Sequence, residues 1–510
     1  MAPLRTLPSA IVAFAVVAAA PAVALAQQCP DGTPPPCAAP TARPPARAPA
    51  VRAQAPASNS VAVLYFDNLS RDSADTYIAD GLTDEVIVRL QHVQRLDVKS
   101  RYEVRRFRGT RVADARSVGR ELRVAYLVTG SVRPGTARMR VSYELVRTSD
   151  GRTIASDIVD TTAADQWAIS NGVALAIAWQ VAGRLAPEER AALIRRPSRD
   201  AQAVDLYRRG TYLVDRGIPG DRFDVLMSIG FFQAAIERDS TFAEPWASMA
   251  EAWGWLDGIF PNRFVAEQGR AAARRALALD SASTKASSAL AYAMMTVDYD
   301  WPGAEHLLRR AIALDPRGVE TRLVLSWVLG ATGLLEEAVR KVEEAWAVDS
   351  LNPRVGFFLY LVLNSARRYD DLLRWADRTA PLGGWEPALR FAAHLGAQRP
   401  DSALAHGGRM GRVLALAAGG RLEEARVLAG RIEADEDSAR AQGREVGDPD
   451  ASAVAWAAVG DRDRAFAALE RSYGIRSGYL LPLIKYLPYF DNLRDDARYH
   501  DLLRRMHLEP

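Results

Sequence analysis

The sequence predicts an α+β protein, in which a small mixed α/β domain precedes an all-α helical solenoid. Two observations support this fold class. Residues 59–186 alternate between apolar runs and amphipathic segments, and tight-turn residues join the last three runs. From about Ala201 onward only helical patterns remain, and they recur with a period in the thirties. The 510 residues also exceed the ~250–300 that one hydrophobic core usually serves, which favours more than one folded part.

The composition is that of a globular protein. Hydrophobic residues make up 49% of the chain and charged residues 25%, which excludes a largely disordered protein. The 65 basic residues nearly balance the 62 acidic ones, so the net charge of +3 provides no general attraction to nucleic acid. We therefore expect no nucleic-acid partner.

Residues 1–26 have the layout of a signal peptide. Arg5 supplies the positive charge, Ala10 to Ala20 form an apolar run, and Ala24-Leu25-Ala26 is a cleavage site of the A-x-A type. The run is far shorter than the ~20 residues that a membrane-spanning helix needs. We therefore expect cleavage before Gln27, a mature chain without a transmembrane span, and a periplasmic or secreted location.

Residues 27–58 are rich in Pro, Ala and Arg, which predicts a disordered, extended spacer. The spacer holds the chain's two cysteines, Cys29 and Cys37, on either side of an Asp31-Gly32 turn. Because export favours an oxidising compartment, a local disulfide between them is the candidate pairing. Two free thiols in a disordered tail are the alternative.

The α/β domain is expected to cover residues 59–186. Its last three strands should form an antiparallel meander, since Pro134-Gly135 and Ser149-Asp150-Gly151 are tight-turn signals. Asp84 and Glu85 are placed in the first turn of its first helix, where acidic side chains favour the helix dipole. The expected strands are Val61–Phe66, Leu96–Ser100, Tyr126–Arg133, Arg138–Thr148 and Arg152–Thr161, and the expected helices cover 77–93, 113–123 and 165–185.

The loop after the first strand is not a phosphate-binding corner. Such a loop needs several glycines and a cation, whereas only Gly81 lies between Phe66 and Thr83. Its aspartates outnumber the single Arg71 and should repel anions, and their spacing is not that of a calcium loop. These aspartates are Asp67, Asp72, Asp75 and Asp80.

Four segments of this domain together resemble the TolB amino-terminal-like (FlgO-like) domain of bacteria. They are "VAVLYFDNLS", "YIADGLTDEVI", "VGRELRVAYLVTGSVR" and "RMRVSYELVRTSDGRTIAS". The sequence departs from the usual pattern at Tyr65, where the family has proline. The resemblance implies a non-catalytic α/β module of envelope proteins and regulators, often found ahead of helical repeats.

After an expected linker at 187–200, residues 201–510 contain the repeats. Similar helical segments end at Ser240, Ser281, Pro316 and Ser350, so they recur every 34 to 41 residues. The complete unit at 317–350, with Gly333 in its turn, resembles the tetratricopeptide repeat. We expect six or seven helical pairs, with a less regular pattern at 381–410 and a C-terminal cap that shields the end of the stack.

The resemblance to tetratricopeptide repeats places a peptide groove along the first helix of each pair. Aromatic anchors with a few cations suit such a groove, because aromatic side chains dominate binding hot spots. The alternative is that these side chains pack against neighbouring helices. The candidate groove residues are Trp255, Lys285, Tyr292, Trp327, Arg354, Phe357 and Leu361.

No catalytic motif stands out in the sequence. Its six histidines form no H-E-x-x-H motif, and neither G-x-S-x-G nor a P-loop occurs. We therefore expect no enzyme, cofactor or metal. The sequence predicts an exported scaffold or adaptor that binds a protein or peptide in the bacterial cell envelope through the groove. A periplasmic ligand-sensing module, in which the α/β domain binds a small molecule, is the alternative.

Overall fold

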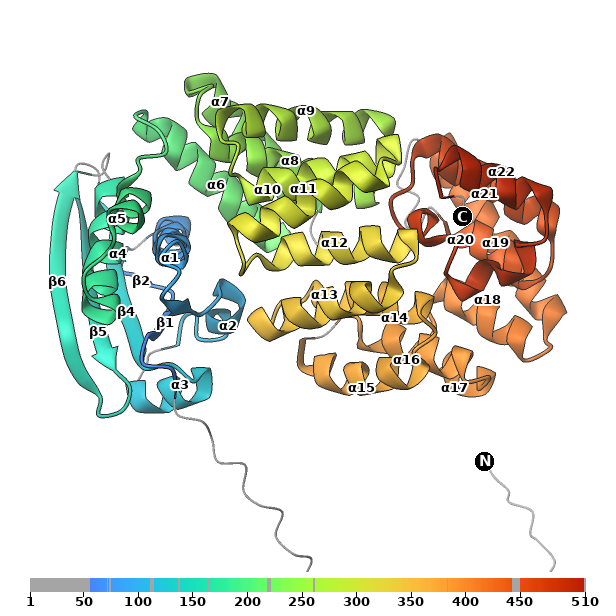
Figure 1. Cartoon of the computed structure of the whole chain (residues 1–510), viewed down its shortest axis with the longest axis horizontal. Coiled ribbons are helices and arrows are strands. Elements are labelled where there is room, and N and C mark those ends of the chain that lie inside the picture. Colours follow the sequence, from blue (N-terminus) through green and yellow to red (C-terminus); the bar gives the residue numbers. More distant parts are fainter. Residues whose placement is uncertain are drawn as a thin grey trace, which may run out of the picture. The chain divides into compact units, whose positions relative to one another are not determined.

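The computed structural model describes residues 56–70, 72, 75–110, 114–135, 138–162, 166–217, 222–259, 262–382, 384–442 and 450–508 (Figure 1). The expected signal peptide and the candidate disulfide of Cys29 and Cys37 lie outside these residues, as does nearly all of the expected spacer. Within the described ranges, no helix has both the length and the apolar character needed to cross a bilayer.

The first part of the described chain contains a mixed sheet with the strand order β3-β1-β4-β5-β6. The short strand β2 also belongs to this sheet and pairs with β4. β1 runs parallel to β3 and β4, whereas β4, β5 and β6 form the expected antiparallel meander. The first strand ends three residues earlier than expected, because the chain turns towards the next helix and the Phe66 N–H donates to Thr83 Oγ1 at 3.0 Å. The strands are β1 Ser60–Val63, β2 Asp67–Asn68, β3 Asp97–Val98, β4 Tyr126–Arg133, β5 Arg138–Arg147 and β6 Arg152–Thr162.

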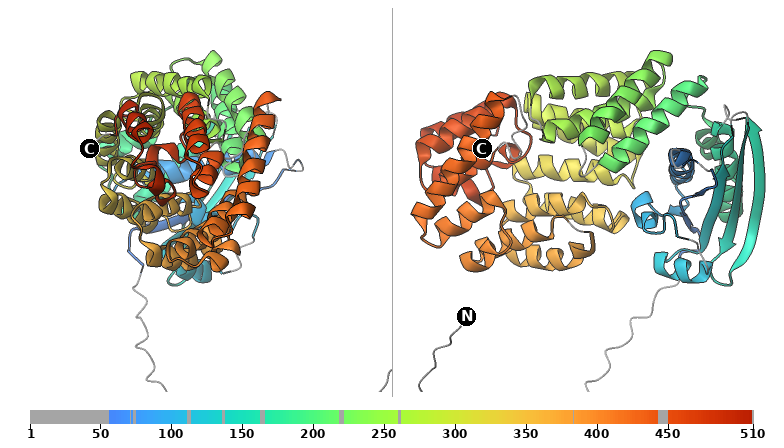
Figure 2. Two further views of the ribbon diagram at one scale, coloured as in Figure 1. Left: turned by 90° about the vertical axis from the view of Figure 1, so that its right-hand side faces the viewer. Right: turned by 180° about the vertical axis from the view of Figure 1, so that it is seen from behind.

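Helices α1 and α4 cover one face of this sheet, the face that looks towards the helical array in Figures 1 and 2. β5 shows the resulting alternation: Met139, Val141 and Tyr143 are buried, while Arg138 and Arg140 are exposed. The helices of this part are α1 Thr76–Gln91, α2 Arg101–Arg105, α3 Ala115–Leu122, α4 Gln166–Ala182 and α5 Pro187–Ile194.

Two expectations about these helices were wrong. Asp84 and Glu85 lie in the middle of α1 and not in its first turn, because the helix already begins at Thr76. The segment 187–200, expected as a linker, contains α5. Pro187 opens this helix, and the Glu189 carboxylate accepts the Ala186 N–H at 2.8 Å and also pairs with Arg95, which fixes the helix start against the first part.

The remaining helices form an array of antiparallel pairs of tetratricopeptide-like length, eight of them between α6/α7 and α20/α21 in the described residues. The short pair α16/α17 occupies the region where the sequence pattern is less regular. The pairs are α6 Ala201–Gly217 with α7 Arg222–Arg238, α8 Ala243–Ile259 with α9 Arg263–Leu279, α10 Thr284–Ala293 with α11 Trp301–Leu314, α12 Val319–Thr332 with α13 Leu335–Val348, α14 Val355–Ser365 with α15 Tyr369–Thr379, α16 Glu386–Gly396 with α17 Pro400–Leu404, α18 Arg409–Ala418 with α19 Leu422–Ala441, and α20 Ala451–Ala458 with α21 Arg462–Ile475. A π-helical turn, Met294–Asp298, follows α10, and a 3₁₀ turn, Ala380–Leu382, follows α15.

The unit α12/α13 shows why these sequences pair. Gly333 ends α12 with a φ of +91°, a left-handed conformation that glycine adopts without strain. On α13 the small residues Ala338 and Ala345 and the intervening Val342 are fully buried, so the two helices can approach closely.

The C-terminal segment covers α20 and α21 but also returns to earlier pairs. It contains the 3₁₀ turns Leu481–Leu483 and Pro488–Leu493 and the helix α22 Ala497–Arg505. Asn492 Nδ2 donates to the Ala457 carbonyl of α20 at 2.7 Å. The Tyr489 hydroxyl accepts from Asn364 of α14 at 2.8 Å, and Trp301 of α11 donates to the Met506 carbonyl at 2.8 Å. The expected cap therefore also ties the end of the array to its middle.

Polar pairs join the sheet-containing part to the array. Glu85 of α1 forms an ion pair with Arg208 of α6 (2.8 Å), and the Tyr77 hydroxyl donates to Asp205 at 3.0 Å. Arg317, just before α12, donates to Asp97 of β3 at 2.8 Å. These pairs hold α1 beside α6 and β3 beside the start of α12.

Candidate functional site

A cavity of about 510 Å³ lies along the first helices of five consecutive pairs, α8, α10, α12, α14 and α16. Residues that follow α21 complete its wall. We call it the aromatic cavity, because seven aromatic side chains line it: Trp255, Tyr292, Trp327, Phe357, Phe358, Trp385 and Tyr479. Its size falls in the range of cavities that hold small ligands or single side chains of a partner.

The structure brings six of the seven candidate groove residues together around this cavity: Trp255, Lys285, Tyr292, Trp327, Arg354 and Phe357. Leu361 is the exception. It lies one turn after Phe357 on α14, but its side chain is 0% exposed and belongs to the hydrophobic core. Its placement in the groove was wrong, because α14 is apolar on every side and helical register alone cannot tell its cavity-facing side from its core-facing side.

The aromatic rings form a continuous row across the cavity. The ring of Trp327 lies 6.0 Å from that of Tyr292 and 5.4 Å from that of Phe357, measured between centroids. Phe357 in turn lies 5.0 Å from Trp385 and stacks on Tyr479 at 5.7 Å. Such tilted and stacked contacts are the favourable geometries for aromatic pairs, so the rings stabilise one another along the wall of the cavity.

Two hydrogen-bond donors on this wall have no partner. The indole nitrogens of Trp255 and Trp327 are buried and form no hydrogen bond within the described residues. Buried indole N–H groups normally find an acceptor, because leaving one unpaired costs ~1–3 kcal/mol. Both indole rings belong to the cavity lining, while their nitrogens are shielded from solvent.

An ionic cluster lies on the same wall. Lys285 Nζ is 3.3 Å from Glu251 Oε2, and Arg354 Nη1 is 2.6 Å from Glu320 Oε2. Arg354 also lies over the ring of Trp255, at 5.4 Å from its centroid, which joins the cluster to the aromatic row. The cluster thus presents both signs of charge at the edge of an apolar surface.

The two carboxylates of the cluster differ in acidity. Burial works to raise the pKa of Glu251, but the neighbouring cations Lys285, Arg354 and Arg101 outweigh it and hold this pKa below its ordinary value. Burial also raises the pKa of Glu320, and Arg354 only partly opposes this effect. Glu251 is therefore the more firmly ionised of the two.

A buried acid stands behind the aromatic row. Asp257 of α8 is fully buried, and burial raises its pKa to about 7, against the hydrogen bonds that it accepts from the Asn262 N–H and the Tyr292 hydroxyl. Burial and the nearby Asp257 also raise the pKa of Tyr292 well above its ordinary value. Tyr292 therefore joins this buried acid to the aromatic row.

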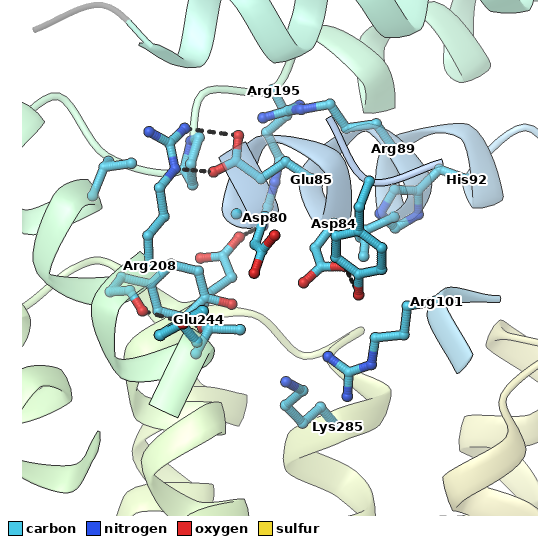
Figure 3. Close-up of a pocket in the computed structure, with 18 of the residues that line it drawn as sticks. Asp80, Asp84, Glu85, Arg89, His92, Arg101, Arg195, Arg208, Glu244 and Lys285 are labelled. Carbon is cyan, nitrogen blue, oxygen red and sulfur yellow. Dashed lines mark hydrogen bonds and ion pairs between the residues drawn. The ribbon is translucent and has the colours of Figure 1, made fainter. Parts of the chain in front are cut away.

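Two further cavities adjoin the aromatic cavity. One, of about 890 Å³, shares Trp385, Ala388 and Tyr479 with it. The other, of about 240 Å³, shares Lys285 with it and lies against α1 (Figure 3). Together they form a succession of hollows along the first helices of the pairs.

Sequence reasoning missed several residues of the aromatic cavity, among them Phe358, Glu251, Glu320, Trp385 and Tyr479. A signal existed for the acids, since Glu251 precedes Trp255 by one helical turn and Glu320 precedes Trp327 by two. No such signal existed for Trp385 and Tyr479, because both lie where the repeat pattern is interrupted and the register is lost.

Comparisons with known proteins add a partial relative and distant structures. No family model matches the chain. The putative adenylate cyclase 3 of Rhizobium meliloti (strain 1021) is 33% identical over 153 residues, which are 30% of this chain and 26% of that protein, so the chain spans about a quarter of this relative. Among solved structures, that of Pseudomonas aeruginosa PilF is 17% identical, covers 40% of this chain and 88% of its own, and has a TM-score of 0.31. The P58(IPK) TPR domain is 11% identical, covers 57% of this chain and 99% of its own, and has a TM-score of 0.13.

Proposed function

We propose that this protein is a non-enzymatic adaptor that binds an extended peptide segment of a protein partner in the aromatic cavity. The observation that carries the proposal is the row of contacting aromatic rings from Tyr292 to Tyr479 along the cavity, beside which Trp255 and Trp327 each keep an unpartnered indole N–H in the described residues. A peptide supplies what this wall lacks, namely backbone carbonyls to accept the indole protons and apolar side chains to cover the rings.

The two kinds of contact have different roles. Apolar side chains of the partner displace water from Phe357, Trp385 and Tyr479, which supplies most of the binding free energy. The indole donors fix the path of the peptide backbone, because a hydrogen bond has a direction that apolar contact lacks. The ionic cluster around Arg354 and Glu251 then selects among peptides by the charge at one end.

The location that we propose is the bacterial envelope, either the periplasm or the outside of the cell. The signal-peptide pattern of residues 1–26 and the resemblance of the first domain to TolB amino-terminal-like modules support it. In this proposal the α/β domain docks onto a second partner, so that the two parts of the chain bring two proteins together.

Selection from a random peptide library on the full chain tests the proposal. A recovered peptide, synthesised with a fluorophore, is titrated against the wild type and against Trp255→Phe and Trp327→Phe, which keep the ring but remove the donor. We expect each variant to bind roughly 2- to 10-fold more weakly, as befits the loss of one hydrogen bond. Tyr292→Ala should weaken binding further by removing part of the aromatic wall.

The matched control is Trp179→Phe, because Trp179 lies on α4, is 59% exposed and is remote from the cavity lining. It should bind the peptide like the wild type. If the cavity variants also bind like the wild type, or if no peptide is recovered from the library, the aromatic cavity is not a peptide site.

A further inference from the structure

The smaller cavity beside α1, which we call the junction pocket, is built by both parts of the chain. One face of α1 supplies its upper wall through Asp80, Asp84 and Glu85, and α2 with the residues after it adds Arg101 and Arg105. The array supplies the rest from α6, the start of α8 and α10. Figure 3 shows Arg101 and Lys285 pointing into the pocket from the side opposite Asp80 and Asp84.

Positive charge predominates in this lining. Seven cationic side chains and four carboxylates belong to the lining, and two of the cations, Lys285 and Arg195, also pair with acids outside it, Glu251 and Asp280: the cations are Arg89, Arg101, Arg105, Arg108, Arg195, Arg208 and Lys285, and the acids are Asp80, Asp84, Glu85 and Glu244. Three of the acids are already paired, Asp80 with Arg108, Glu85 with Arg208 at 2.8 Å, and Glu244 with Arg195 at 2.9 Å. Asp84 accepts a hydrogen bond from the Tyr65 hydroxyl at 3.2 Å.

The acidic loop before α1 therefore does not decide the character of this region. Asp67, Asp72 and Asp75 are not part of the pocket lining, and Asp80 lies in α1 with Arg108 as its partner. Apart from Arg89 of α1 itself, the arginines of the lining come from α2 and the residues after it, from the residue after α5 and from α6, which the sequence does not place near α1.

Two arginines of the lining retain unused donors. Arg89 is 9% exposed; its Nη1 donates to the Leu193 carbonyl at 2.8 Å, but its buried Nε has no hydrogen-bond partner in the described residues. Arg105 is exposed and forms no ion pair with any described residue. The Arg89 guanidinium lies over the ring of Trp167, 5.5 Å from its centroid, so Arg105 is the cation of the lining that an oxyanion can pair with.

Aromatic rings form the other walls of the pocket. They belong to Tyr65, Tyr102, Tyr207, Tyr212 and Phe242. Arg108 lies over the rings of Tyr65 and Tyr212, at 5.6 and 5.9 Å from their centroids, so the cations and rings alternate around one small space. Flat apolar walls of this kind favour a ring in the ligand.

We propose that the junction pocket binds a small aromatic oxyanion, a ring that carries a carboxylate or a phosphate group. The acidic group lies among the arginines and the ring among the tyrosines. Because the pocket draws its walls from α1, α2, α6 and α10, the bound anion holds the α/β part and the array together. Such a site gives the α/β domain a ligand-sensing role in addition to the proposed peptide binding, and it is testable without any peptide.

Calorimetric titration of the full chain at low ionic strength with four probes tests the assignment. The probes share a phenyl ring and differ in charge: 3-phenylpropionate, phenyl phosphate, phenylalanine and phenethylamine. We expect the two anions to bind, the zwitterion to bind at least roughly tenfold more weakly, and the cation not to bind. The stronger of the two anions identifies the acidic group. Equal binding of phenylalanine or phenethylamine, or no binding of either anion, would overturn the proposal.

Neighbouring residues provide matched variants. Arg105→Gln removes a cation from the lining, whereas Arg106→Gln removes the next arginine, which pairs with Glu121 and is not part of the lining. Both arginines are exposed, so both variants should fold, which circular dichroism checks. Anion binding should weaken roughly 5- to 10-fold in Arg105→Gln and stay unchanged in Arg106→Gln. An equal effect of the two variants would show that the anion binds by general attraction and not in the pocket.

Discussion

Replacing Asp257 with Asn should remove a large part of the pH dependence of stability between about pH 4 and pH 7. Burial raises the pKa of this carboxyl from 3.8 to about 7 in the folded protein. Between these values the folded protein keeps a proton that the unfolded chain releases. The free energy of unfolding therefore falls as pH rises, by ~1.4 kcal/mol per pH unit.

Over the whole window this amounts to about 4 kcal/mol that the wild type loses and the variant keeps. Asn has nearly the same shape as Asp, and its side-chain oxygen can accept the hydrogen bonds from the Tyr292 hydroxyl and the Asn262 N–H. Below pH 4 the two proteins should therefore be similarly stable. At pH 8 Asp257→Asn should be the more stable one, because it carries no buried negative charge.

The assay is denaturant unfolding of both proteins at pH 5 and pH 8, followed by tryptophan fluorescence. The difference between the variant and the wild type should grow by about 3 kcal/mol between these two pH values. Asp349, whose pKa burial raises to about 6, is present in both proteins, so its effect cancels in the comparison. Identical pH profiles for the two proteins would refute the reasoning, since Asp257 would then be ionised in the folded state.

Three further predictions concern the array and its junction with the sheet. Gly333→Ala should lower the free energy of unfolding by at least about 3 kcal/mol, because the residue has a left-handed φ and the added methyl would overlap the Tyr486 hydroxyl. Gly420→Ala should lower it by only about 1 kcal/mol, because Gly420 has a φ of +77° but no atom within 4 Å of the added methyl. Chemical denaturation of the two variants compares them. Arg208→Ala should cost about 3–5 kcal/mol in the same assay, since Arg208 is 3% exposed and its loss leaves Glu85 unpaired; an effect below 1 kcal/mol would contradict this role. Lys285→Gln should weaken the binding of both 3-phenylpropionate and the peptide, whereas Arg105→Gln should weaken only that of 3-phenylpropionate. Titration with each ligand checks this, and an unchanged peptide affinity of Lys285→Gln would show that Lys285 does not link the two cavities.

The parts of the fold that were predicted well have local signals at both ends. β4 has the expected bounds, Tyr126–Arg133, because Pro134-Gly135 marks its end directly in the sequence. α2 was not expected, since five residues are too few to show a helical period, although Ser100 and Glu103 form a capping box at its start. α5 was missed for a related reason: its eight residues begin with Pro187, shortly after Gly183, and this combination is also typical of a linker.

The residues of the candidate site likewise divide into those with a local sequence signal and those without one. Six of its residues could be placed because they share a register with complete repeats, and Leu361 could not be distinguished from them by register alone. Trp385 and Tyr479 depend on how distant segments pack, which no local pattern describes. The junction pocket is the extreme case, because its arginines come from four separate stretches of the chain that only the tertiary structure brings together.

The return of the C-terminal segment to α11 and α14 has a mechanical consequence. Open arrays of helical pairs are elastic, because each pair touches only its neighbours and the array can stretch by small rotations at every interface. Here the Asn364–Tyr489 and Trp301–Met506 hydrogen bonds join the C-terminal segment to α14 and α11, across several pairs of the array. Stretching the array then requires breaking these hydrogen bonds, so we expect the array to resist widening of the aromatic cavity. For the proposed peptide binding, this favours an extended segment of chain over a folded surface as the bound part of a partner.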